Sequence, residues 1–233
     1  MNSATTNIGL AHYWAQGDFV SHAVAYVLLA LSIASWYYIL SKAWSAWRIR
    51  KSAHALDGFW KAANLTDAIA LLQAADSETV YAPLAVHAVE AASMQAQGGG
   101  HGTPSLNAST DLAELITRTL RREIGRVSAR LESGLTLLAS VGSTAPFIGL
   151  FGTVWGIYHA LVAVSAAGTV QIDKVAGPVG EALIMTALGL LVAIPAVLAY
   201  NAFTRVNRLT LAELDGFAYD LHAYLTTGAR VGH

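Results

Sequence analysis

Charge is scarce in this sequence. Only 12% of its 233 residues are Asp, Glu, Lys or Arg, about half of the roughly 25% that is usual for soluble domains. Mean hydropathy is +0.47. The composition therefore favours a membrane protein over a soluble domain.

Cysteine is absent, which excludes a disulfide framework, a thiol nucleophile and a cysteine metal cluster. The formal net charge of −1 argues against nucleic acid as a partner. Strand patterns are also lacking, so we expect an all-α fold.

Three stretches are long enough to cross a bilayer, which needs about 20 apolar residues of helix. Residues 19–41, 133–172 and 182–204 contain no Asp, Glu, Lys or Arg. The first stretch has no Lys or Arg before it and carries aromatic residues near its basic end, so we expect a membrane anchor and not a signal peptide.

Basic residues predict the orientation of these spans. Thirteen of the 14 Lys and Arg fall on one side of the membrane, and only Lys174 falls on the other. The positive-inside rule makes the first side cytoplasmic. The predicted order is an N-terminal segment outside (1–18), a first span (19–41), a cytoplasmic helical domain (42–134), a second span (135–164), an outer loop (165–178), a third span (179–203) and a cytoplasmic C-terminal helix (204–233).

The predicted cytoplasmic domain begins with short amphipathic helices and is interrupted by QGGGHGTPS, residues 97–105, a flexible connector. Beyond Asp111 a 3.6-residue apolar period predicts a long helix, and no proline precedes Pro146, so we expect this helix to run straight into the second span. A similar period follows the third span. We therefore expect the helices of spans two and three to extend into the cytoplasm and pack together there.

Small residues form a stripe on each of the last two spans. Small side chains let helix backbones approach closely in lipid, so these positions predict helix packing or a subunit interface. Three helices can use only part of such a surface, which favours self-association, although packing within one chain is the alternative for about half of it. The predicted contact residues are Gly142, Gly149, Gly152, Gly156, Ala182, Gly189 and Ala193.

Polar residues within the spans are few. Thr153 and Thr186 lie on the two small-residue stripes, and Glu181 stands at the start of the third span. A carboxylate in a bilayer costs about 2.5–3.5 kcal/mol and commonly marks an ion or proton path. The alternatives are threonine hydroxyls bonded to their own helices, and a Glu181 that is solvated at the headgroup boundary or paired with Lys174.

Histidines offer no convincing metal site. His22 and His159 lie near the outer ends of spans, where we expect interfacial or packing roles. His87 and Glu90 share a helical spacing, but two residues are weak evidence for a metal site. We expect no metal and no cofactor.

Several segments of the spans resemble one family. GLFGTVWGI (residues 149–157), GEALIMTALGL (180–190) and AIPAVLAYN (193–201) occur in order. Over about residues 135–203 the chain is similar to the ExbB/TolQ family of bacterial inner-membrane proteins, which is related more distantly to the flagellar stator protein MotA. The C-terminal tail is more similar to ExbB than to TolQ.

The resemblance implies a function. Family members form a pentameric ring around single transmembrane helices of a partner, ExbD, which supplies a membrane aspartate. Proton flow through the assembly energises TonB and drives uptake across the outer membrane. The resemblance therefore implies a homo-oligomer in the bacterial inner membrane with its N-terminus in the periplasm, and a proton path or pore lining that includes Thr153, Glu181 and Thr186.

Other functions remain open at this point. A TolQ-like protein would use the same machinery for envelope integrity, and a MotA-like torque generator is less favoured. A membrane-embedded enzyme is disfavoured because the spans contain no nucleophile–base set. A structural scaffold would not depend on Glu181 or Thr186.

Replacing Glu181 separates a proton-driven energy transducer from a structural scaffold, whereas a partner pull-down would distinguish a TonB-linked from a TolA-linked role. We expect Glu181→Ala to abolish TonB-dependent uptake, measured as siderophore-supported growth, while the oligomer still assembles. Partial function is expected from Ser at positions 153 and 186 and less from Val. Normal growth of the Glu181→Ala strain would remove this carboxylate from the mechanism.

Overall fold

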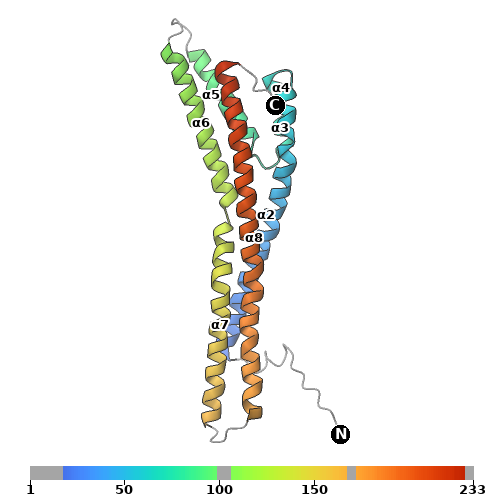
Figure 1. Ribbon diagram of the computed structural model, residues 1–233, viewed down its shortest axis with the longest axis vertical. Helices are drawn as coiled ribbons and strands as arrows, with labels where there is room; N and C mark the ends of the chain where they lie inside the picture. The colour runs from blue at the N-terminus through green and yellow to red at the C-terminus, as the bar shows by residue number, and fades with distance from the viewer. Residues whose placement is uncertain (1–17, 99–105, 167–171, 229–233) are drawn as a thin grey trace. The chain divides into compact units, whose positions relative to one another are not determined.

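The computed structural model describes residues 18–98, 106–166 and 172–228, and for 96–98, 106–111, 166, 172–176 and Glu181 it describes the backbone alone. These residues form helices and no strand (Figure 1). The predicted all-α fold is confirmed. The helices are α2 (Phe19–Ala53), α3 (Ala55–Lys61), α4 (Leu65–Ala75), α5 (Ala82–Gly98), α6 (Leu106–Glu132), α7 (Leu135–Ala166) and α8 (Ile172–Thr227).

The chain divides into two compact units. The membrane unit comprises Met1–Leu40 and Gly134–Asn201, and the charged unit comprises Ser41–Ser133 and Ala202–His233. The helical segments Phe19–Lys61 (α2 and α3), Leu112–Ser165 (α6 and α7) and Gly177–Thr227 (α8) each contain a stretch long and apolar enough to cross a membrane. The predicted membrane boundaries stay predictions, because α2 and α8 continue through them as regular helix.

Four predicted segments fall partly outside the described residues. These are the N-terminal segment 1–18, the connector 97–105, the outer loop 165–178 and the C-terminal helix 204–233. Of the predicted outer loop 165–178, residues 172–178 belong to the first turns of α8, so helix begins before the expected start of the third span at residue 179.

A hydrophobic core fills the charged unit. The apolar stripe on α6 points into this core: of its neighbours Leu115 and Ile116, Ile116 is fully buried whereas Leu115 is exposed. The stripe on α8 is buried only in its later part, since Leu209 is 55% exposed. The buried residues that α6 and α8 contribute are Ile116, Leu120, Val127, Leu131, Leu214, Phe217, Ala218 and Leu221.

A polar loop between α4 and α5 ties several elements of the charged unit together. The carboxylate of Asp76 accepts hydrogen bonds from the backbone N–H groups of Tyr81 (2.7 Å) and Ala82 (2.8 Å) at the start of α5, where unpaired donors and the helix dipole favour an anion. Thr79 has a positive φ of 53°. The guanidinium of Arg130 on α6 donates to its hydroxyl and carbonyl oxygens, both at 2.7 Å.

Titratable groups around this loop are shifted by burial. Burial raises the pKa of the Tyr81 phenol, and the neighbouring Glu213 carboxylate, which accepts its hydrogen bond at 3.2 Å, adds to that rise. Burial lowers the pKa of Lys42. The ammonium of Lys42 donates to the carbonyl oxygens of Arg130 (3.2 Å) and Leu131 (2.8 Å) at the end of α6, which lack partners within the helix.

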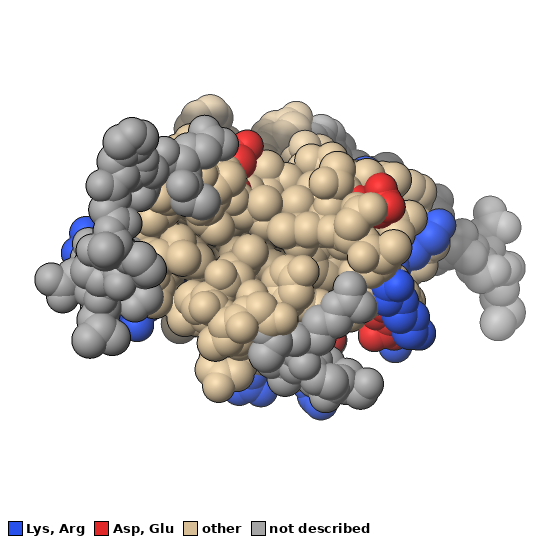
Figure 2. Space-filling model, turned by 90° about the horizontal axis from the view of Figure 1, so that it is seen from above, with Lys and Arg blue, Asp and Glu red and all other residues tan. Residues whose placement is uncertain are grey.

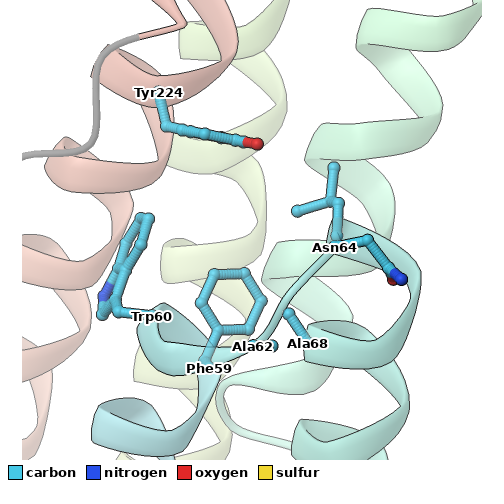
Figure 3. Close-up of a pocket in the computed structure, with 7 residues that line it drawn as sticks. Phe59, Trp60, Ala62, Asn64, Ala68 and Tyr224 are labelled. Atoms are coloured by element: carbon cyan, nitrogen blue, oxygen red, sulfur yellow. The ribbon is translucent and has the colours of Figure 1, made fainter.

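Aromatic side chains close the far end of the core around a small cavity, which Figure 3 shows. Phe59 and Trp60 of α3 meet edge to face with ring centroids 5.0 Å apart, and Trp60 meets Tyr224 of α8 at 6.2 Å. The cavity measures about 10 Å³, room for one water molecule at most. It is a packing gap and not a ligand site.

In Figure 2, most of the surface in view is uncharged, and basic side chains lie at its margins.

The helix expected to run straight into the second span is interrupted. α6 ends at Glu132 and α7 begins at Leu135, with a turn at Ser133 and Gly134 between them. Gly134 has a φ of +80°, the left-handed conformation that ends many helices and that glycine adopts without a Cβ penalty. The expectation of one continuous helix was wrong because it considered proline alone as a helix breaker.

A matched pair of glycines tests this turn. A Cβ at Gly134 would collide with the ring of Tyr38, whereas a Cβ at Gly125 within α6 would meet nothing within 4 Å. We expect Gly134→Ala to destabilise the protein by at least the roughly 1–2 kcal/mol that a left-handed residue costs. Gly125→Ala should be neutral or stabilise by up to about 1 kcal/mol. Thermal unfolding of both variants in detergent checks this, and equal midpoints would contradict it.

Candidate functional site: the α7–α8 contact in the membrane unit

Small residues bring α7 and α8 together almost backbone to backbone. A Cβ at Gly149 would lie 2.5 Å from the carbonyl oxygen of Met185 and 3.0 Å from the Cα of Gly189. Likewise, a Cβ at Gly189 would lie 2.6 Å from the carbonyl oxygen of Ala145. Only glycine fits at either position without displacing the opposite helix.

The contacts run antiparallel along the two helices. Towards the end of α8, a Cβ at Gly142 would collide with Val197; towards its beginning, a Cβ at Gly156 would lie 2.9 Å from the Cβ of Ala182. Position numbers thus rise on one helix as they fall on the other. In lipid, where apolar side chains supply little driving force between helices, such close approach is the main source of attraction.

The remaining predicted packing residues also lie within this unit. Gly152 is directed towards α2 and α8, since a Cβ there would lie 3.1 Å from Val24 and 3.2 Å from Met185. Ala182 and Ala193 are buried, each 4% exposed. Every glycine of the two stripes is therefore in contact within one chain, which removes the small-residue argument for self-association. Whether any of these positions also serves a subunit interface stays a prediction.

Two of the predicted polar residues meet at the centre of this contact. The hydroxyl oxygens of Thr153 on α7 and Thr186 on α8 are 2.5 Å apart. The Thr153 hydroxyl also lies 3.0 Å from the carbonyl oxygen of Ala182 on α8 and 3.2 Å from that of Gly149 on its own helix. The alternative expected for an intramembrane threonine, a bond back to its own helix, is present beside the interhelical bonds.

Burial differs between the two hydroxyls. Thr153 is 6% exposed, whereas Thr186 is half-buried. A threonine hydroxyl has one proton to donate and two lone pairs that accept. Thr186 is therefore the more exposed residue of the pair.

Glu181 lies one residue before Ala182 in α8, and its side chain is outside the described part of the structure. The backbone puts it in the helical turn that contains the Ala182 carbonyl, to which Thr153 bonds. A role for its carboxylate in a proton path stays a prediction.

The sequence did not indicate a polar contact that joins α7 to the residue preceding α2. The indole N–H of Trp155 on α7 donates to the carboxylate of Asp18 (3.0 Å), which precedes α2. This bond, and a second from the backbone N–H of Phe19, hold the pKa of Asp18 below its usual range. His159 lies 3.9 Å from the same carboxylate. No pattern in the sequence relates residues 18 and 155, which are 137 positions apart.

His87, which shares a helical spacing with Glu90, instead pairs with the carboxylate of Glu123 on α6 at 3.2 Å. Arg126 holds the same carboxylate at 2.6 Å. Among the described residues, no three His, Cys, Asp or Glu side chains are grouped to hold a metal ion.

The hydrogen bond between the two threonines can be tested directly. We expect Thr153→Val, which keeps the shape but removes the hydroxyl, to destabilise the helix pair by about 0.6 kcal/mol, the average for interhelical hydrogen bonds in membranes. Thr153→Ser, which keeps the hydroxyl, should lose less. Thermal unfolding in detergent measures both, with Thr144→Val as control, because Thr144 is exposed and its hydroxyl donates to the Ser140 carbonyl of its own helix. Equal destabilisation by Val at positions 144 and 153 would contradict this expectation.

Comparison with known proteins agrees with the resemblance seen in the spans. Residues 84–215 match the MotA/TolQ/ExbB proton channel family. The chain is 44% identical to the biopolymer transport protein ExbB of Xanthomonas campestris pv. campestris (strain B100), over 99% of this chain and 93% of that relative.

Two further relatives extend the comparison. ExbB of Neisseria meningitidis serogroup A is 40% identical over 90% of this chain and 93% of its own length. The Tol-Pal system protein TolQ of Pseudomonas aeruginosa is 42% identical, but over only 48% of either chain. On these matches, and on the multi-pass helical architecture, this chain belongs to the MotA/TolQ/ExbB proton channel family.

Proposed function

We propose that this protein is the ExbB-like subunit of a proton-driven energy transducer that powers uptake across the outer membrane. The observation that carries this proposal is the extent of similarity: the ExbB proteins of Xanthomonas campestris and Neisseria meningitidis match 99% and 90% of the chain, whereas the TolQ match extends over about half of it. A TolQ-like role in envelope integrity is therefore the second candidate.

The proposed setting is the bacterial inner membrane, with the N-terminus in the periplasm and the C-terminus in the cytoplasm. The charge distribution supports this orientation, because all but one of the 14 Lys and Arg lie on the side of the charged unit. The proposed partners are further copies of this chain in a pentamer, an ExbD-like single-span protein with a membrane aspartate, and a TonB-like transducer. No covalent chemistry is proposed for the chain.

The threonine pair suggests what this subunit contributes. If Thr186 donates to Thr153, and Thr153 donates to the Ala182 carbonyl, both hydroxyl protons are used within the chain. The Thr186 oxygen then offers only a lone pair. Such an acceptor stabilises a protonated carboxyl group, which donates, over a carboxylate, which cannot. We propose that this junction holds the partner's aspartate in its protonated form.

Glu181 is proposed to shape this path or to hold neighbouring subunits, while the partner's aspartate carries the proton. The proposal rests on its place in the same turn of α8 as Ala182. A purely structural scaffold is the remaining alternative, and it requires no hydroxyl at position 186.

Complementation distinguishes the candidates. We expect the chain, expressed with its own ExbD-like partner, to restore siderophore-dependent growth in a strain that lacks ExbB and TolQ, and not to restore detergent resistance. Thr186→Val should reduce that growth strongly, whereas Thr186→Ser should retain much of it, because only Ser keeps the acceptor oxygen. Rescue of detergent resistance alone would favour the TolQ-like role, and full growth with Thr186→Val would favour the scaffold.

A further inference from the structure

A groove in the charged unit is lined by aromatic and basic side chains of α2. It has a volume of about 460 Å³, within the range of roughly 300–1,000 Å³ that is typical of small-molecule sites. The end of α4 and the residue Ser77 form its other wall. The lining residues are Trp44, Trp47, Arg48, Lys51, Ala74, Ala75 and Ser77.

The four α2 residues share one face of the helix. Their spacing is i, i+3, i+4 and i+7, which brings them together on consecutive turns. Trp44 and Trp47 are 65% and 60% exposed, and their rings lie 5.8 Å apart at a tilt of 51°. Two large aromatic side chains are thus exposed to solvent at the groove. Other aromatic rings of the charged unit are buried in its core.

This face follows directly after the first charge-free stretch. Lys42 is the first charged residue after Asp18, and Trp44 and Trp47 come two and five residues later, about 3 and 8 Å further along a helix. The polar layer of one leaflet is roughly 5–8 Å thick. Both tryptophans therefore fall at headgroup depth, where Trp is enriched in membrane proteins.

Positive charge is concentrated in the same segment. Residues 42–51 contain four Lys or Arg and no Asp or Glu. Arg48 is compensated, since its guanidinium pairs with Glu78 at 3.1 Å and bonds to Ser77. Lys51 is exposed and has no ion pair within the described parts of the chain. Helix side chains lean towards the N-terminus of their helix, which here brings the Lys51 ammonium towards the membrane.

We propose that this groove binds the headgroup of an anionic phospholipid such as phosphatidylglycerol. The Lys51 ammonium pairs with the phosphate, and the Ser77 hydroxyl, which accepts from Arg48 (3.1 Å) and keeps its own proton, donates to it. The rings of Trp44 and Trp47 pack against the glycerol backbone and the first acyl carbons. Clusters of Lys and Arg beside a transmembrane helix attract anionic lipid in the same way.

Charge and position together favour lipid over a second copy of the chain. A protein contact that excluded water would bury the unpaired Lys51 charge, which is costly without a matching carboxylate. A phospholipid supplies that negative charge and places its acyl chains beside the apolar span. This lipid site does not depend on the transport function proposed above.

Lipid retention tests the site in the intact protein. The protein is placed in nanodiscs of equal phosphatidylglycerol and phosphatidylcholine, then extracted gently, and the bound lipids are counted by native mass spectrometry. We expect wild type to retain phosphatidylglycerol about fivefold over phosphatidylcholine, and Lys51→Ala to bring that ratio close to one, since a basic residue at a membrane surface contributes about a factor of five. Loss of both rings in Trp44→Ala/Trp47→Ala should lower the retention of both lipids.

Lys61→Ala is the matched control, because Lys61 is exposed, carries the same charge and lies at the end of α3 outside the groove. It should leave the ratio unchanged. An equal effect of the two lysine variants would show that only general surface charge matters and would overturn the proposal. A change of oligomeric state in Lys51→Ala would also overturn it, because it would identify a contact between copies of the chain. Displacement of the lipid by inorganic phosphate would overturn it as well, because it would identify a free-anion site.

Discussion

The membrane unit depends on the absence of side chains where α7 meets α8. Gly149 and Gly189 face each other so closely that a Cβ on either would press on a backbone carbonyl. Lipid tails are as apolar as leucine side chains, so helices gain little from apolar contact alone, and close backbone approach provides the attraction that holds the pair. The two threonine hydroxyls meet only because this contact is so close.

The charged unit is held together instead by an apolar core and by the polar loop between α4 and α5. There the carboxylate of Asp76 caps α5, and the guanidinium of Arg130 holds Thr79 in a left-handed conformation. Such a conformation is costly for a β-branched residue. The two hydrogen bonds from Arg130 offset that cost and fix the loop beside α2, whose outward face carries the proposed lipid groove.

The function proposed for each unit rests on one polar residue that the fold leaves at least partly exposed. In the membrane unit, Thr186 is the more exposed member of a hydroxyl pair that also contacts the Ala182 carbonyl. A neutral acceptor of this kind suits a carboxyl group that must gain and lose a proton in an apolar environment, because a fixed charge at the bilayer centre would itself cost about 2.5–3.5 kcal/mol. In the charged unit, Lys51 is the uncompensated cation beside an aromatic surface.

By itself, the sequence determined the three charge-free spans, the all-α class and the stripes of small residues, because composition and helical period depend on local chemistry alone. It also indicated Thr153 and Thr186 as the polar members of facing stripes. Only the tertiary structure decided that those stripes pack within one chain and that the left-handed Gly134 separates α6 from α7. Only it joined Trp155 to Asp18 across 137 residues. Pairings of this kind depend on how helices dock, and no periodicity along a single helix specifies its partner.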